Sequence, residues 1–135
     1  MTSCLLDTNI LSYFIRGRHP LLHERVERAL KTKQAMTSVI VRAEMRFGQQ
    51  RMSPDDKRRP AIDLLLDELP TLPWTAATAD AYGFLKKQLQ SAGRPIGELD
   101  TQIAAHALAE GLILVTHNTR HFDRIAGLAL EDWMV

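Results

Sequence analysis

Short runs of apolar residues alternate with longer stretches of helical spacing along this chain of 135 residues. The clearest run is Leu-Ile-Leu-Val at residues 112–115, which follows a helix-like stretch closed by Gly111. A continuous apolar run of this length is typical of a strand that is buried on both faces. Such strands alternating with helices predict an α/β domain with a mostly parallel sheet.

The same pattern gives the expected positions of the individual elements. We expect strands at residues 3–6, 35–38, 72–74, 112–115 and 128–130. We expect helices at residues 9–15, 20–33, 38–51, 54–69, 75–91, 98–109 and 119–125, the fourth broken or kinked near Pro60. Ser38 is a plausible N-cap, and the length fits one domain over residues 1–135.

Composition excludes several classes of protein. Apolar residues make up 45% and charged residues 24%, which is ordinary for a folded domain. Aromatic residues make up only 6%, which argues against a platform for stacking bases. The net charge is +1, so any surface that attracts nucleic acid must be local. Cys4 is the single cysteine, which excludes an intrachain disulfide and fits a reducing compartment.

Targeting signals are not evident in the sequence. No segment reaches the roughly 18 consecutive apolar residues of a membrane-spanning helix. The first residues, MTSCLLDTN, lack the basic lead and the long apolar run of a signal peptide. We therefore expect a soluble cytoplasmic protein with no membrane partner.

Polar residues directly follow two of the expected strands. Asp7 comes after the first strand, and Thr116, His117 and Asn118 come after residues 112–115. Ligands of open parallel sheets bind beyond the carboxyl ends of the strands, so we expect these side chains on one rim. Taken alone, Asp7 is as compatible with a structural role as with a site.

Two further acids lie on otherwise apolar helical stretches. Glu44 and Asp100 stand among apolar neighbours, where a carboxylate is costly unless it is paired or binds a cation. Gathered carboxylates repel, and a hard divalent ion such as Mg²⁺ or Mn²⁺ removes that repulsion. The bound ion can activate a water for attack on a phosphodiester. A solvated surface carboxylate or a salt-bridge partner is the alternative for Glu44.

Four motifs across almost the whole chain resemble the PIN-domain ribonucleases and, within them, the VapC toxins of type II toxin–antitoxin modules. The motifs are LLDTNIL, SVIVRAEMRFG, GRPIGELDTQIAAHALAEGLILVTHNTRHF and GLALEDW. The resemblance implies a three-layer α/β/α sandwich with a mostly parallel central sheet of four to five strands. It also implies a metal-dependent endoribonuclease that is usually a homodimer and cuts particular sites in tRNA or rRNA.

The resemblance also assigns the catalytic residues. Asp7 of DTN, Glu44 of RAEM and Asp100 of GELD match three acids of the family, which hold Mg²⁺, with Mn²⁺ as a substitute. Asn118 falls where many relatives carry a fourth acid, and it keeps an oxygen but not the charge. Glu98 is a candidate replacement carboxylate, or else a first-turn acid favoured by the helix dipole.

Substrate contacts are expected around this rim and on a nearby basic segment. Thr8, Asn9 and Thr116 are candidates to hold ligands or substrate, although Thr8 and Asn9 could equally cap a helix. Residues 42–59 carry a net charge of +3, and Arg42, Arg46 and Arg94 are candidate phosphate contacts. A solvated basic face is the alternative.

A VapB-type antitoxin is the partner that the resemblance implies, with a C-terminal segment that wraps the toxin and blocks the acidic site. The candidate groove residues are Ile10, Phe14, Val41, Met45 and Phe47, which could instead be ordinary core.

Two other functions stay open at this point. The first is a catalytically weak PIN-like module that binds RNA or protein, which the neutral Asn118 allows. The second is a phosphoaspartate enzyme with Asp7 as nucleophile, disfavoured because no lysine follows Gln88. A zinc site at His117 and His121 is disfavoured because no further Cys or His completes a motif. We expect packing roles for the remaining candidates, which are Cys4, Trp74, His106 and Trp133.

Overall fold

The structure, a computed structural model, describes residues 3–135. Within that range the strands are β1 (Cys4–Leu6), β2 (Ala35–Ser38), β3 (Thr71–Leu72), β4 (Ile113–Val115) and β5 (Leu130–Glu131). The helices are α1 (Thr8–Arg16), α2 (Pro20–Lys31), α3 (Val39–Gln50), α4 (Arg58–Glu68), α5 (Ala76–Ser91), α6 (Glu98–Glu110) and α7 (Thr119–Phe122).

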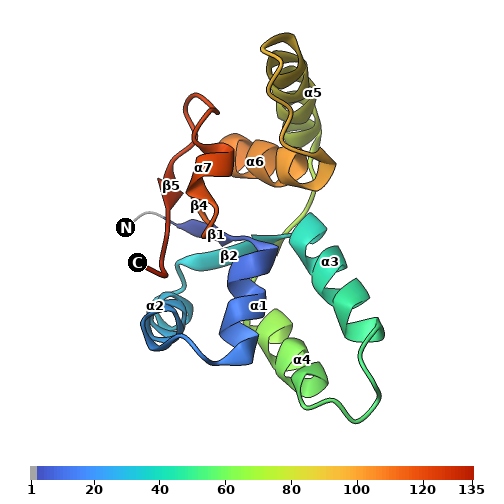
Figure 1. Cartoon of the computed structure of the whole chain (residues 1–135), viewed down its shortest axis with the longest axis vertical. Helices are drawn as coiled ribbons and strands as arrows, with labels where there is room; N and C mark the ends of the chain where they lie inside the picture. The colour runs from blue at the N-terminus through green and yellow to red at the C-terminus, as the bar shows by residue number, and fades with distance from the viewer. Residues whose placement is uncertain (1–2) are drawn as a thin grey trace.

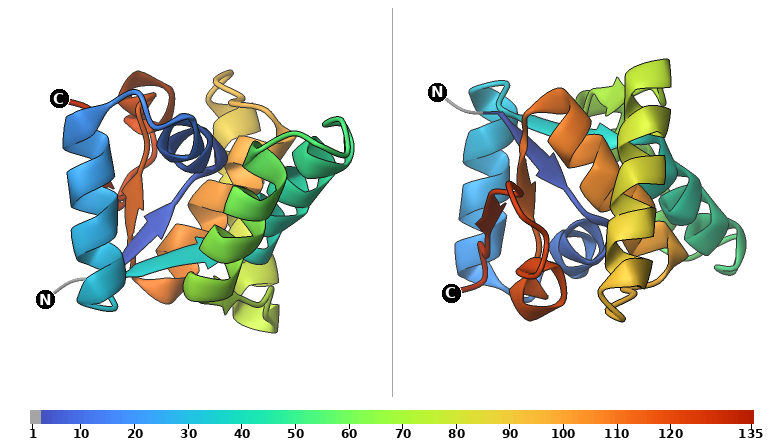
Figure 2. Two further views of the ribbon diagram at one scale, coloured as in Figure 1. Left: turned by 90° about the horizontal axis from the view of Figure 1, so that it is seen from below. Right: turned by 90° about the horizontal axis from the view of Figure 1, so that it is seen from above.

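The strands form one sheet in the order β3-β2-β1-β4-β5, and every neighbouring pair is parallel. Figure 1 shows α1, α2 and α4 on one side of the sheet and α6, with α5 packed against it, on the other. Both views of Figure 2 show the strands fanning out between these helices. The predicted α/β/α sandwich is confirmed, with a sheet that is parallel throughout.

The centre of the sheet is the most deeply buried part of the chain. In β1 and β4, Leu5, Leu6, Leu114 and Val115 have no exposed surface. Helices cover both faces of these strands, so the residues on both sides of the backbone must be apolar. This is why the strands are continuous apolar runs rather than alternating ones. The parallel pairing of β1 with β4, with Leu6 opposite Val115, places the carboxyl ends of these two strands side by side.

The structure corrects several predicted boundaries. The predicted helix at residues 54–69 begins only at Arg58, so Pro60 lies in its first turn and causes no break. A first-turn residue has no helical carbonyl for its N–H to reach, so proline is tolerated there. Strand β3 ends at Leu72, before Pro73, which cannot donate a ladder hydrogen bond. Strand β5 begins at Leu130, two residues later than the predicted start at residue 128.

His106 of α6 joins three segments of the core. Its side chain is fully buried, and its Nε2 lies 3.1 Å from the carbonyl oxygen of Pro73. Because that carbonyl can only accept, Nε2 carries the proton and Nδ1 accepts from the Ser38 hydroxyl at 2.7 Å. The Ser38 oxygen in turn accepts from Ile40 N–H and caps α3. The predictions of a structural His106 and of a Ser38 N-cap are confirmed.

Two other predicted packing residues lie in the core. Cys4 and Trp133 are buried, and the indole N–H of Trp133 donates to Glu131. Trp74 is half-buried and packs edge-on against the rings of Tyr82 and His106. These contacts confirm packing roles for all three.

We predict that His106→Ala lowers the free energy of unfolding by about 3 kcal/mol, because it opens a cavity and leaves buried partners without hydrogen bonds. Burial lowers the pKa of His106, so its contribution is present above pH 6.5 and is lost as the pH falls below that value. Urea unfolding at pH 7.5 and 5.5 measures both effects. Ser38→Ala should lower the free energy of unfolding by less in the His106→Ala protein than in the wild type. Additive losses would contradict the pairing.

Candidate metal centre

Asp7 lies at the end of β1, where it caps α1. Its Oδ1 accepts from Ile10 N–H at 2.9 Å, and its own N–H donates to the Val115 carbonyl of β4. The buried Thr116 hydroxyl also hydrogen-bonds to the Asp7 carboxylate and accepts from Asn118 N–H. The residue is only 6% exposed. Asp7, rather than Thr8 or Asn9, therefore caps the first helix.

Glu44 approaches the same place from α3. The Thr8 hydroxyl of α1 donates to Glu44 Oε1 at 2.7 Å. This bond joins two helices, and the buried side chains of Ile10, Val41 and Met45 lie in the core beneath them. Of the five candidate groove residues, Ile10, Val41 and Met45 are buried, Phe14 is half-buried and Phe47 is 65% exposed.

Asp100 comes from the first turn of α6. Its Oδ2 lies 2.8 Å from Nε2 of His121, and that nitrogen also lies 2.6 Å from the Ile96 carbonyl oxygen. Because the Ile96 carbonyl only accepts, Nε2 of His121 is protonated and faces both oxygens. His121 of α7 thus contacts Asp100 of α6, and no local sequence pattern indicates this contact.

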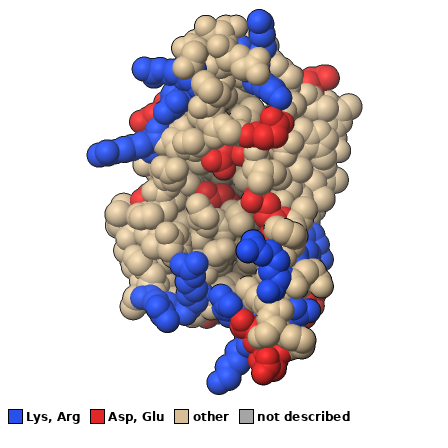
Figure 3. All heavy atoms as spheres, turned by 45° about the vertical axis from the view of Figure 1, so that its right-hand side comes forward, with Lys and Arg blue, Asp and Glu red and all other residues tan. Residues whose placement is uncertain are grey.

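These acids line one cleft of about 500 Å³, which we call the acidic cleft and define by Asp7, Glu44, Glu98 and Asp100. Thr8 and Asn9 line it as well. Figure 3 shows Asp and Glu side chains gathered in the middle of this face, with Lys and Arg above and below them. The three acids that the sequence predicts therefore meet at the carboxyl ends of β1 and β2 and at the start of α6.

The electrostatics of the cleft penalise the charge on Asp7. Burial raises its pKa to about 6, and the neighbouring charges of Asp100 and Glu44 add to the rise. The hydrogen bonds from Ile10 N–H and Thr116 oppose it. A cation in the cleft would favour the charged form and remove this penalty.

The donor set fits a hard ion that keeps much of its water. Across residues 3–135, no three His, Cys, Asp or Glu side chains converge closely enough to ligate one ion together. Mg²⁺ usually retains several waters and takes one or two carboxylates directly. The oxygen donors of Asp7, Glu44 and Asp100 suit that mode of binding, with water completing the shell.

Glu98 and Asn118 are placed differently from these three. Glu98 lines the acidic cleft, but its carboxylate accepts from the Tyr82 hydroxyl and lies 2.9 Å from Nζ of Lys86. The Tyr82 hydrogen bond and the Lys86 ammonium lower the pKa of Glu98. Asn118 is exposed at the start of α7 and is not among the residues that line the cleft.

The predicted basic segment is largely engaged within the protein. Arg42 donates to the Leu66 carbonyl and the Thr71 hydroxyl, and Arg46 pairs with Asp63. Arg94 is exposed and lines a separate hollow beside α5 rather than the acidic cleft.

The two histidines of the zinc hypothesis take different partners. His117 lies 3.0 Å from Asp132, whereas His121 faces Asp100. The structure brings no cysteine or third histidine to them within the described part of the chain.

Residues 4–128 match the PIN domain family. Over 133 residues the chain is 33% identical to the tRNA(fMet)-specific endonuclease VapC of Shigella flexneri, with 98% of this chain and 99% of that protein covered. It is 34% identical over 129 residues to Ribonuclease VapC2 of Rickettsia felis, with 96% of each covered.

Solved structures of VapBC proteins are also similar to this chain. VapBC2 from Rickettsia felis, bound to a DNA fragment from the promoter, superposes with a TM-score of 0.88 at 33% identity, covering 96% of this chain and 98% of that one. VapBC-1 from nontypeable Haemophilus influenzae superposes with a TM-score of 0.85 at 34% identity, covering 98% of both chains.

In residues 3–135, no helix has the length and apolar character needed to cross a bilayer.

We predict that Asp7→Asn stabilises the metal-free protein at pH 7, by at most about 3 kcal/mol, because it removes a penalised charge and keeps an acceptor for Ile10 N–H. The raised pKa of Asp7 means that the wild type regains this stability as the pH falls through about 6 towards 4. Urea unfolding in EDTA at pH 7.5 and 4 tests both statements. Asp67→Asn, an exposed acid of α4, is the control. A destabilised Asp7→Asn protein at pH 7.5 would contradict this account.

Proposed function

This chain belongs to the PIN domain family, and from that premise we propose that it is the Mg²⁺-dependent endoribonuclease toxin of a VapBC-type toxin–antitoxin module. The observation that carries the proposal is the acidic cleft. Asp7, Glu44 and Asp100 come from three separate elements and face one hollow at the carboxyl end of a parallel sheet.

The residues of the cleft have distinct roles in this proposal. Asp7, Glu44 and Asp100 would hold Mg²⁺, with Mn²⁺ as a substitute, one or two of them directly and the rest through bound water. An ion bound there would supply a water of lowered pKa and would stabilise the charge that develops on the phosphodiester. Asn118 and Glu98 stay weaker candidates for this machinery, because one does not line the cleft and the other is paired with Lys86.

Three neighbouring side chains hold the acids in place. Thr116 orients Asp7, Thr8 orients Glu44 and His121 orients Asp100. The three partners come from separate parts of the chain, since Thr116 follows β4, Thr8 lies in α1 and His121 lies in α7. Partners of this kind usually alter metal affinity or activity by about 10- to 100-fold when they are removed.

We propose that the substrate is tRNA or rRNA. The Shigella flexneri relative is described as tRNA(fMet)-specific, and this chain is similar to it over almost its full length. RNA also suits a hydrolytic cleft with separate cationic surfaces on either side.

We propose a VapB-type antitoxin as the partner, because the solved relatives are VapBC assemblies. An antitoxin segment that enters the acidic cleft would present a counter-charge to the carboxylates and exclude RNA. We also propose that the protein forms a homodimer and is located in the cytoplasm. Light scattering of the purified chain measures its oligomeric state.

We predict that the wild type cleaves RNA in Mg²⁺ and loses cleavage in EDTA. Asp7→Asn, Glu44→Gln and Asp100→Asn should each reduce the rate by about 100-fold or more, since ligand loss exceeds the effect of losing an outer partner. Cleavage of total tRNA and rRNA, followed by sequencing of the new RNA ends, measures the rate and identifies the site. Thermal melting confirms that each variant is folded.

The control for cleavage is Asp67→Asn, which removes an exposed acid of α4 and should cleave like the wild type. Equal cleavage by wild type and Asp7→Asn would show that the site is wrong. A wild type that binds RNA without cutting it in Mg²⁺ or Mn²⁺ would instead favour a catalytically weak RNA-binding module.

We predict that a VapB-type antitoxin encoded beside this chain co-purifies with it and suppresses its RNA cleavage. Co-expression with an affinity tag on the antitoxin, followed by cleavage assays of the complex and of the separated toxin, measures both. Cleavage at full rate by the intact complex would contradict inhibition at the acidic cleft.

A further inference from the structure

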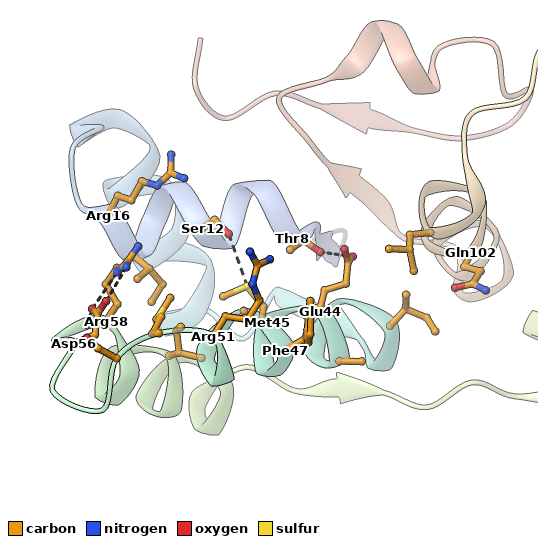
Figure 4. Close-up of a pocket in the computed structure, with 18 residues that line it drawn as sticks. Thr8, Ser12, Arg16, Glu44, Met45, Phe47, Arg51, Asp56, Arg58 and Gln102 are labelled. Carbon is orange, nitrogen blue, oxygen red and sulfur yellow. Dashed lines mark hydrogen bonds and ion pairs between the residues drawn. The ribbon is translucent and has the colours of Figure 1, made fainter.

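A second hollow, of about 1120 Å³, adjoins the acidic cleft. We call it the α1–α3 groove, because residues of these two helices form most of its walls. Thr8, Glu44 and Leu99 line both hollows, so the groove is continuous with the acidic cleft. Figure 4 shows the Thr8–Glu44 contact in this groove and the Arg58–Asp56 ion pair towards its far end.

The groove changes its electrostatic character along its length. Glu44 lies where it meets the acidic cleft, whereas Arg16 and Arg51 line it farther along. Within residues 3–135, neither guanidinium takes part in an ion pair, although Arg46 and Arg58 each pair with an aspartate. Arg16 and Arg51 are thus the exposed cations of this groove that have no carboxylate partner in the described chain.

An aromatic side chain lies beside one of these arginines. Phe47 lines the groove with 65% of its surface exposed, which is unusual for a large apolar side chain. The Arg51 guanidinium carbon lies 5.6 Å from the centre of the Phe47 ring. An exposed ring and a guanidinium plane are the two side-chain surfaces on which unpaired bases stack.

We propose that the α1–α3 groove binds the single-stranded RNA that flanks the bond being cut, with a base stacked on Phe47 and a phosphate bound to Arg51. The inference rests on the proposed ribonuclease function and names its substrate-positioning residues. Charge complementarity supports RNA as the occupant: the cations lie beyond the carboxylates, where the next phosphates of a strand would pass.

The low aromatic content of the chain argues against a platform that stacks several bases in a row. A site for a single stacked base needs only one exposed ring. One exposed ring next to one free guanidinium is enough to hold one base, so a composition of 6% aromatic residues does not exclude it. The groove binds a strand at a single base, rather than along a row of rings.

The test measures RNA binding separately from cleavage. In an Asp7→Asn background, fluorescence anisotropy with a mixed-sequence single-stranded RNA of about 12 nucleotides reports binding of uncut RNA. Phe47→Ala should weaken binding about five- to fiftyfold, and Phe47→Trp should restore it. Arg51→Gln should reduce the slope of log K against log salt by about 0.7, and Arg51→Lys should keep the slope.

Matched controls exist in a hollow that shares no lining residue with the α1–α3 groove or the acidic cleft. Phe84, 67% exposed, and Arg124 line a separate hollow beside α5. In the Asp7→Asn background, Phe84→Ala and Arg124→Ala should bind RNA like Asp7→Asn alone. In the otherwise wild-type protein, the same two changes should leave RNA cleavage unchanged. Cleavage of a dinucleotide, which is too short to span the cleft and Phe47, should be unchanged by Phe47→Ala.

Each outcome separates this inference from the proposed function. If the wild type cleaves RNA while Phe47→Ala and Arg51→Gln bind RNA like the α5 controls, the groove assignment is wrong and the ribonuclease stands. If those variants lose only antitoxin binding, the groove belongs to a peptide and the RNA assignment is wrong. Failure of the wild type to cleave any RNA counts against the proposed function alone, since anisotropy still reports the groove.

Discussion

The buried carboxylate of Asp7 is the interaction on which the rest of the site depends. It is held at the junction of β1, β4 and α1, where it caps a helix and accepts a bond from Thr116. The two other acids approach it closely enough to raise its pKa further. A fold that stabilised itself alone would place a neutral side chain here. The retained charge is therefore a cost to stability that a cation can offset.

The parallel sheet explains how distant residues reach one cleft. Pairing of β1 with both β2 and β4 brings the carboxyl ends of these strands to one rim. Asp7 follows the first strand, and the helix that begins after β2 carries Glu44. Helix α6, which precedes β4 along the chain, runs back from that rim and so presents Asp100 in its first turn.

Much of this arrangement could be predicted from the sequence, and the failures have physical causes. Asp7 was predictable because a strand end fixes the position of the next residue. The same rule also predicted Asn118 on this rim, but Asn118 does not line the cleft, because the chain turns into α7 two residues beyond Thr116. The hydrogen bond of Arg42 to Thr71 and the ion pair of Arg46 with Asp63 could not be predicted, because these partners are distant in sequence. Long-range partners leave no local pattern.

The bond between Thr8 and Glu44 has a genetic consequence. It ties a carboxylate on α3 to Thr8 of α1, so the spacing of these two helices also sets the position of Glu44. That spacing is fixed by buried side chains such as Ile10, Val41 and Met45. Cells that escape the activity of this protein should therefore carry inactivating alleles in that core as well as at the acids.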